Sequence, residues 1–250
     1  MTQSSNYTKG KNMTHKSGPV PQIKSTLVDS MGSDLSVVNA ARVSFGKKSE
    51  WVNDNQLLPS LPDKDTKLIK YLAKHKHLSP FGHAFASFHV KAPIFVARQL
   101  VKHKFLRWNE ISRRYVDEEP EFYNPDVWRG RSEDKKQGSK GEITTSCVID
   151  SSGEYTHPKF AAMDVNDTSF VIYLSMIRAG VAPEQARMVL PQSTMTEFYW
   201  SGSLDAFASM CVLRLKGDTQ YETRLVAQQI DEVMSGLFPV SWKALVHDEA

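Results

Sequence analysis

The chain has 250 residues, of which 40% are hydrophobic and 24% charged, and its formal net charge is +3. This length and balance predict a soluble globular protein with one substantial core, and they exclude a disordered chain and a protein that binds polyanions over its whole surface. No stretch approaches the about 18 apolar residues of a membrane span, and the N-terminus lacks an apolar signal core, so we expect a cytoplasmic protein without a membrane partner.

Residues 1–21 are mostly small and polar, with few large apolar side chains. They cannot bury enough apolar surface to offset the entropy of ordering, so we expect a flexible N-terminal arm there. Residues 22–246 are expected to form one folded domain. A charged, glycine-containing insert is expected to interrupt this domain at about 117–158.

Hydrophobic periodicity predicts the elements of this domain in chain order. Alternating apolar and polar residues indicate strands at 23–28, 84–90 and 194–200. Helical periodicity indicates helices at 34–42, 63–75, from 93 onward, and at 167–180, 184–189, 204–215 and 219–237. The stretch that follows Trp108 is polar and has no clear period, so we expect a loop there.

Residues 98–115 concentrate Arg and Lys around few apolar side chains. On a helix, Arg98 and Lys102 would share one face, and Gln99 and His103 another. A helix end followed by a loop with guanidinium, hydroxyl and amide groups suits a phosphate and a nucleobase edge. Anion binding is therefore one interpretation of the segment, and a solvated basic face is the other.

Arg214 lies almost on the apolar face of the predicted helix 204–215, seven residues after Phe207. A charged group at such a position is costly unless it is paired or faces a cleft, so a functional role is one interpretation. The alternative is a side chain that extends from the helix end to water and interacts with the helix dipole.

Three histidines, His75, His77 and His83, fall close together in the chain. Their spacing is not that of a His-Glu-x-x-His motif, and no acidic ligand lies between them. We therefore expect no metal site there.

Three parts of the basic segment form a motif: Arg98-Gln99, the triplet Lys102-His103-Lys104, and the run from Asn109 to Tyr115. This motif resembles the signature of flavin-dependent thymidylate synthases (ThyX), although that family usually has Arg-His-Arg at the triplet. Further segments that resemble the family lie at 40–45, 77–83 and 184–191, and Gly82 stands where the family often has Glu. The resemblance covers about residues 23–240.

The resemblance implies an α+β fold, a single domain with a central, mainly antiparallel sheet flanked by helices. It implies an enzyme that reductively methylates 2′-deoxyuridine 5′-monophosphate (dUMP) to thymidylate (dTMP). Flavin adenine dinucleotide (FAD) would be the cofactor, and 5,10-methylenetetrahydrofolate and NADPH or NADH the co-substrates. The resemblance also implies a homotetramer with shared active sites and no nucleic-acid partner.

The resemblance further assigns roles to residues. Arg214 would be catalytic, because an Arg beside the uracil ring stabilises negative charge that develops on it. The implied substrate-binding residues are Gln99, Lys102, Glu110, Ser112, Arg113, Arg114, Arg187 and Arg214. The implied flavin-binding residues are Ser79, Lys102, His103, Lys104, Glu110, Ser203 and Ser209, where the family usually has Asn at the last two. His77 and Tyr115 would lie on the folate or nicotinamide side.

Three alternatives remain open. One is a divergent relative that makes another 5-substituted pyrimidine nucleotide, or that binds flavin weakly. A second is a basic module for single-stranded nucleic acid, since basic residues lie close to the stacking groups Phe105, Trp108 and Tyr115. A third is a cysteine-dependent synthase, but Cys147 lies in the insert and Cys211 on an apolar helix face, so neither predicts an activated thiolate.

Overall fold

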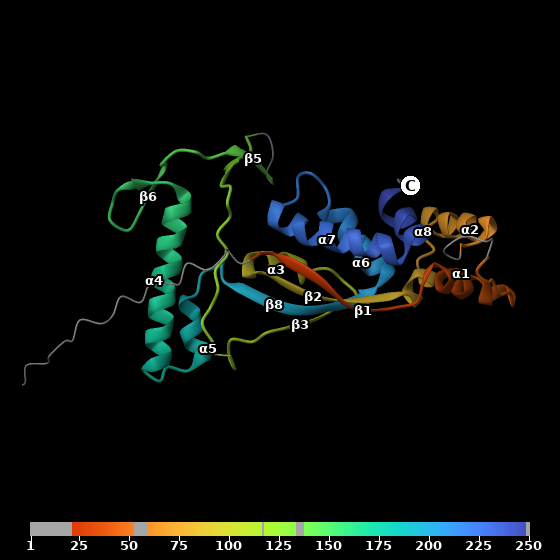
Figure 1. Ribbon diagram of the computed structural model, residues 1–250, viewed down its shortest axis with the longest axis horizontal. Helices are drawn as coiled ribbons and strands as arrows, with labels where there is room; N and C mark the ends of the chain where they lie inside the picture. The colour runs from red at the N-terminus through yellow and green to blue at the C-terminus, as the bar shows by residue number, and fades with distance from the viewer. Residues whose placement is uncertain (1–21, 53–59, 117, 134–137, 249–250) are drawn as a thin grey trace, which may run out of the picture. The chain divides into compact units, whose positions relative to one another are not determined.

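The computed structural model describes residues 22–52, 60–116, 118–133 and 138–248 (Figure 1). The arm expected at residues 1–21 lies outside these residues, so it stays a prediction. The chain divides into two compact units, and each is considered by itself below. The larger unit comprises Gln22–Ile111, Arg129–Glu142 and Met195–Ala250, and the described part of the smaller unit comprises Ser112–Trp128 and Ile143–Thr194.

A four-stranded sheet forms the centre of the larger unit. Its order is β1-β2-β8-β3, and every neighbouring pair is antiparallel. The strands are β1 (Lys24–Met31), β2 (Phe85–Pro93), β8 (Met195–Ser203) and β3 (Leu106–Glu110). The α+β fold class with a central antiparallel sheet is therefore confirmed. The strand β3 corrects one expectation, because a loop had been expected from Trp108 onward.

Helices cover one face of this sheet because alternate strand residues are apolar. Phe88 of β2 and Trp200 of β8 are fully buried, and both lie edge-on to Phe207, with ring centroids 5.3 and 5.5 Å away. Figure 1 shows α3, α6 and α7 on the same side of the strands. These helices are α3 (Ile94–Leu100), α6 (Leu204–Arg214) and α7 (Tyr221–Leu237).

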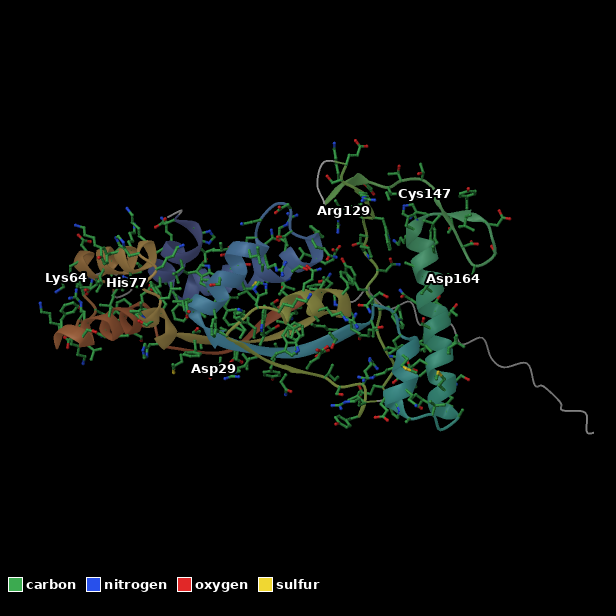
Figure 2. The ribbon with its side chains drawn as sticks, turned by 180° about the vertical axis from the view of Figure 1, so that it is seen from behind. Asp29, Lys64, His77, Arg129, Cys147 and Asp164 are labelled. Atoms are coloured by element: carbon green, nitrogen blue, oxygen red, sulfur yellow. The ribbon has the colours of Figure 1, made fainter. Side chains whose placement is uncertain are left out.

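A second group of helices packs beyond the end of the sheet. It consists of α1 (Asp34–Arg42), α2 (Asp63–Lys74) and α8 (Pro239–Trp242), with the short turns η1 (Val43–Phe45), η2 (Ser79–His83) and η4 (Lys243–His247). Arg42 forms an ion pair with the buried Asp65, which joins α1 to α2. His77, labelled in Figure 2, is exposed in the segment between α2 and η2.

The remaining strands of the larger unit form a hairpin within the expected insert. Its strands are β4 (Arg129–Arg131) and β5 (Ser139–Glu142), which pair antiparallel. The hairpin therefore belongs to the same unit as the central sheet.

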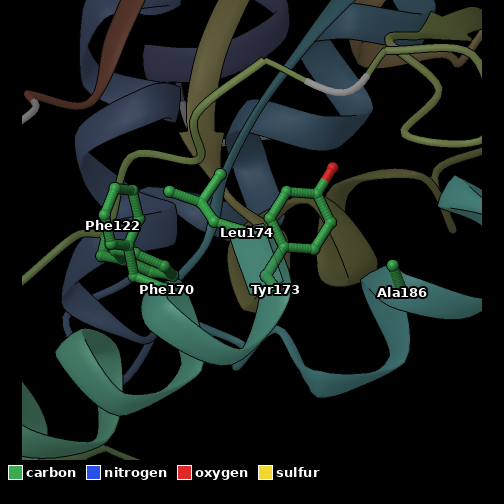
Figure 3. Close-up of a cluster of buried hydrophobic side chains, with 5 residues drawn as sticks. All are labelled: Phe122, Phe170, Tyr173, Leu174 and Ala186. Atoms are coloured by element: carbon green, nitrogen blue, oxygen red, sulfur yellow. The ribbon is translucent and has the colours of Figure 1, made fainter. Parts of the chain in front are cut away.

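The smaller unit has its own apolar core, made of Phe122, Phe170, Tyr173, Leu174 and Ala186 (Figure 3). Its elements are α4 (Pro158–Arg178), α5 (Pro183–Ala186), η3 (Arg187–Val189) and the short strands β6 (Val148–Ile149) and β7 (Tyr155–Thr156). The helix expected at 167–180 is longer than predicted, because it already begins at Pro158.

Candidate active site

Arg214 occupies the last turn of α6 and is half-buried. Its Nε donates a hydrogen bond to Nε2 of His103 at 2.9 Å, and one terminal nitrogen donates to the backbone oxygen of Gln99 at 3.4 Å. The side chain therefore does not extend freely into water. The larger unit brings together three residues that the sequence analysis had singled out separately.

His103 lies in the turn between α3 and β3, with its ring 6.4 Å from that of Trp200 in an edge-on arrangement. Burial, followed by the positive charge of Arg214, lowers the pKa of His103 to about 4. A neutral imidazole has one acceptor nitrogen, and here that nitrogen, Nε2, accepts the hydrogen bond that Arg214 Nε donates. Burial also lowers the pKa of Arg214 from its ordinary value.

The amide of Gln99 is held by the first turn of α7. Its Nε2 donates to Oε1 of Gln220, and its Oε1 accepts a hydrogen bond from Thr223 Oγ1 at 3.3 Å. Gln99 therefore has a fixed orientation next to Arg214. The sequence analysis did not select Gln220 or Thr223, because nothing in the local pattern places α7 beside α3.

The two lysines of the triplet, Lys102 and Lys104, are both exposed. Phe105, which follows them, has φ +64° and is 84% exposed. This backbone conformation is unfavourable for a bulky residue, and such conformations are concentrated at functional sites. Phe105 is therefore a site candidate that the sequence analysis considered only for nucleic-acid stacking.

A pocket of about 440 Å³ opens beside this turn, where β2 and β3 begin and β8 ends. Its lining residues are Phe85, Phe105, Leu106, Arg107, Ser201, Gly202 and Ser203. A Cβ on Gly202 would lie 3.0 Å from the backbone oxygen of Phe105, so glycine permits the close approach of β3 to β8. The pocket combines apolar walls with one guanidinium and two hydroxyls, a composition typical of ligand sites.

Ser203 and Ser209, both expected to bind flavin, lie at the N-terminus of α6 and within α6. Ser203 is the N-cap residue of α6 and lines the pocket, whereas Ser209 is exposed within the helix. Ser79 begins η2 and is also exposed. The ring of His77 lies 6.1 Å from that of Tyr71 and 6.2 Å from that of His75.

Glu110 ends β3, and both of its carboxylate oxygens accept hydrogen bonds. Oε1 accepts from Thr196 Oγ1 at 2.7 Å, and Oε2 accepts from the indole of Trp108 at 3.1 Å. These contacts fix the carboxylate on the sheet edge. Each oxygen retains capacity for a further donor.

The smaller unit holds the other group of expected site residues. Arg114 Nε donates to Ser112 Oγ at 3.2 Å, and the Arg114 guanidinium lies 5.0 Å from the ring centre of Tyr115. Arg113 instead donates to the backbone oxygen of Glu118 at 2.9 Å. Ser112, Arg114 and Tyr115 therefore form one local cluster, in which Arg114 and Tyr115 are exposed.

Arg187 begins η3 of the smaller unit and is exposed. Its Nε donates to the backbone oxygen of Glu184 at 3.2 Å, which leaves the terminal nitrogens for other acceptors. Among the residues that the structure describes, no group of three His, Cys, Asp or Glu side chains is arranged to hold a metal ion. No helix in the described ranges is long and apolar enough to cross a membrane.

The family model described as "Thymidylate synthase complementing protein" matches residues 26–240. Among curated proteins, the flavin-dependent thymidylate synthase of Thermus thermophilus is 38% identical over 218 residues, which span 87% of this chain and 73% of that protein. The flavin-dependent thymidylate synthase of Thermosipho africanus is 36% identical over 88% of this chain and 89% of that protein.

Solved structures agree with these sequence matches. The UMP/dUMP methylase PolB from Streptomyces cacaoi, bound with 5-Br UMP, is similar with a TM-score of 0.73 and 30% identity. The match covers 89% of this chain and 93% of that one. The same protein bound with 5-Br dUMP gives a TM-score of 0.71.

Proposed function

The chain belongs to the flavin-dependent thymidylate synthase family, and on that premise we propose that it methylates dUMP to dTMP. In this reaction 5,10-methylenetetrahydrofolate supplies the carbon, and NADPH or NADH supplies the reducing equivalents. The observation that carries the proposal is the placement of Arg214, which is anchored by His103 and by the Gln99 backbone inside the motif region.

The proposed role of Arg214 follows from its anchoring. Methylation at C5 of uracil requires that the ring become more nucleophilic, which places negative charge on its N3 or O2 edge. A guanidinium held beside that edge stabilises the charge without having to reorganise. Among the described residues, His103 and Gln99 accept from two of the five N–H donors of Arg214, and we propose that the pyrimidine uses other donors of this side chain.

The nucleotide phosphate requires fixed positive charge, which the smaller unit offers. Arg114 is held by Ser112, and Arg187 is exposed, with only its Nε hydrogen-bonded among the described residues. Arg presents paired N–H groups that match phosphate oxygens. We propose Arg114 and Arg187 as the main phosphate ligands, with Ser112 and Arg113 beside them and Gln99, Lys102 and Glu110 completing the substrate contacts.

The residues around the pocket fit a flavin. Phe85, Phe105 and Leu106 give an apolar wall for a ring system, and the exposed Lys102, Lys104 and Arg107 give positive charge for phosphates. The other residues proposed to hold the cofactor are Ser79, His103, Glu110, Ser203 and Ser209. Bound FAD supplies hydride transfer from the nicotinamide, and His77 and Tyr115 are proposed to lie on the folate or nicotinamide side.

The described cysteines do not favour attack by an enzyme thiolate. Cys211 is fully buried, and burial together with the Asp231 carboxylate raises the pKa of its thiol. Cys147 is exposed in the smaller unit (Figure 2). The proposed chemistry therefore activates the substrate through Arg214 rather than through a covalent bond to the enzyme.

We further propose a homotetramer with active sites shared between subunits, located in the cytoplasm. Arg114 and Arg187, the proposed phosphate ligands of the smaller unit, are both exposed. This supports the assembly, because a second subunit packed against such a surface would complete a binding site there. Residues 22–246 are proposed as the catalytic domain with its insert.

The proposal is tested by product formation. Purified protein supplied with dUMP, methylenetetrahydrofolate, FAD and NADPH is expected to form dTMP, and omission of any one is expected to stop it. NADH in place of NADPH identifies the reductant. Lack of dTMP in the complete mixture, combined with salt-sensitive binding of single-stranded DNA, would favour the nucleic-acid module instead.

A second candidate function is methylation of UMP. The structural relative named a UMP/dUMP methylase matches most of this chain, and it supports the alternative of another 5-substituted pyrimidine nucleotide. Parallel assays with UMP and dUMP separate the two. A higher kcat/KM for UMP would make dUMP the secondary substrate.

A further inference from the structure

The β4–β5 hairpin of the insert is attached to the first turn of α7 through Arg129. One terminal nitrogen of Arg129 forms an ion pair with Oε1 of Glu222, and its Nε donates to Ser139 Oγ at 3.0 Å. Its guanidinium also lies 4.5 Å from the ring centre of Tyr221. Glu222 is only 4% exposed, so its carboxylate depends on this partner.

Glu222 is also the first member of a hydrogen-bonded chain that reaches the site. Its Oε2 accepts from Gln220 Nε2 at 3.3 Å, and Gln220 Oε1 accepts from Gln99 Nε2. Gln99 Oε1 in turn accepts from Thr223 Oγ1 at 3.3 Å. Three contacts in sequence therefore connect the insert to a residue proposed to bind the substrate. They join Arg129 to Glu222, Glu222 to Gln220 and Gln220 to Gln99.

The carboxylate of Glu222 determines which way the side-chain amides of Gln220 and Gln99 face. A carboxylate in an ion pair has acceptors only, so Gln220 must turn its NH₂ group toward Glu222. The oxygen of Gln220 then faces Gln99 and requires the NH₂ group of Gln99. The Gln99 amide is consequently held in one of its two orientations, which differ only by exchange of oxygen and nitrogen.

We propose that Arg129 and Glu222 are positioning residues that fix the Gln99 amide for the nucleotide, which gives the insert hairpin a role in substrate recognition. This inference rests on the proposed function, because it assumes that Gln99 contacts dUMP. Glu222 is not among the residues proposed to bind the substrate or the cofactor. Its effect is transmitted through Gln220.

The test replaces Glu222 by Gln, which keeps the shape of the side chain but adds an NH₂ donor. The new side chain no longer forces Gln220 to turn its NH₂ group toward position 222. Binding of dUMP to the flavin-loaded protein is measured by calorimetry. We expect Glu222→Gln to weaken dUMP binding about tenfold, the size of one hydrogen bond lost at a binding site. Arg131→Met, an exposed position in the same strand, is the matched control and is expected to leave the Kd unchanged.

A double-mutant cycle separates positioning from a general structural effect. In a Gln99→Ala background, Glu222→Gln is expected to change the dUMP Kd by less than about twofold, because the group it orients is gone. Arg129→Met combined with Glu222→Gln avoids an unpaired buried charge and is expected to behave like Glu222→Gln alone. An equal loss of affinity in both backgrounds, or no loss in the wild-type background, would overturn the inference while the proposed function stands. Failure of the wild-type protein to bind dUMP would overturn the proposed function, and this inference with it.

Discussion

Arg214 Nε donates to His103 Nε2 at 2.9 Å, which joins the end of α6 to the turn after α3 across 111 residues of sequence. The contact requires an unprotonated His103, because a protonated imidazole has donors only. The lowered pKa of His103 keeps that acceptor available at neutral pH. The hydrogen bond between Arg214 and His103 is therefore expected to be lost as the pH falls through the pKa of His103.

The first prediction concerns stability against pH. The pKa of His103 is about 4 in the folded protein against an ordinary value of 6.5. Between these values the unfolded chain binds more protons at this position, so the free energy of unfolding decreases as pH falls through this window. We expect the difference in unfolding free energy between wild type and His103→Gln to be largest above pH 6.5 and to shrink toward pH 4.

Urea unfolding curves across this pH range measure the effect. His77→Gln, at an exposed histidine of the same unit, is the control for the loss of one imidazole. A difference between wild type and His103→Gln that is equal at both ends of the range would contradict the assignment.

The second prediction concerns Arg214→Lys. A lysine keeps one positive charge but loses the planar fork that contacts His103 and Gln99 while facing the substrate. We expect kcat for dTMP formation to fall about 10²–10³-fold, as for the loss of one donor that stabilises developing charge. Arg224→Lys on α7 serves as the control. Turnover within a factor of about two of wild type would remove Arg214 from the proposed chemistry.

The third prediction concerns Phe105→Gly. Glycine adopts the observed φ of +64° without strain, and the ring is 84% exposed, so the free energy of unfolding is expected to be unchanged or slightly higher. Loss of one aromatic contact is expected to weaken FAD binding about tenfold. Flavin fluorescence titration measures it, with Phe160→Ala, an exposed aromatic of the smaller unit, as control. Unchanged FAD affinity would show that the pocket does not receive the flavin ring.

The fourth prediction concerns the cysteines. Because the Cys211 thiol is buried with a raised pKa, it is not expected to be a nucleophile. The double variant Cys147→Ala and Cys211→Ala is expected to form dTMP with kcat within about twofold of wild type. The replacement at Cys211 leaves a small cavity and lowers stability, so the assay belongs well below the melting temperature. Complete loss of turnover in folded double variant would instead support a cysteine-dependent mechanism.

Periodicity in the sequence predicted most elements of the larger unit, because strands such as β2 and β8 alternate clearly between buried and exposed residues. It missed β3, whose residues include Asn109 and Glu110. This strand depends on pairing with β8, where Trp108 lies opposite Trp200, and on stacking of Trp108 against Phe198 at 3.6 Å. A partner about ninety residues away leaves no local signal.

The ends and caps of the helices were also predicted only in part. The sequence does contain a signal for the start of α4, because proline is favoured in the first turn of a helix and Pro158 lies there. His157 is the N-cap residue, and its Nδ1 accepts from the backbone N–H of Lys159. Asp34 opens the helix predicted at 34–42, and a residue of this type at a helix start often caps that helix. Its carboxylate instead accepts from the backbone N–H groups of Val240 and Ser241, both at 2.9 Å, and so caps α8.

For the candidate site, the motif in residues 98–115 identified Gln99 and His103, and the position of Arg214 on the predicted helix 204–215 identified Arg214. Only the structure shows that the three residues are in contact. Thr219 and Glu222 have the spacing of a capping box in the sequence, but in the structure Thr219 donates to the backbone oxygen of Leu213 and Glu222 pairs with Arg129. Both departures arise from contacts with residues outside the helix. Local sequence cannot predict such contacts, because it does not contain the partners.

The central claim is that a pyrimidine nucleotide binds next to the flavin, with Arg214 facing the nucleotide. The most direct measurement is the visible absorbance of the FAD-loaded protein during titration with dUMP. We expect a saturable shift of the flavin bands that is strongly reduced in Arg214→Lys. A flavin spectrum that dUMP leaves unchanged, in protein shown by calorimetry to have bound it, would contradict the claim.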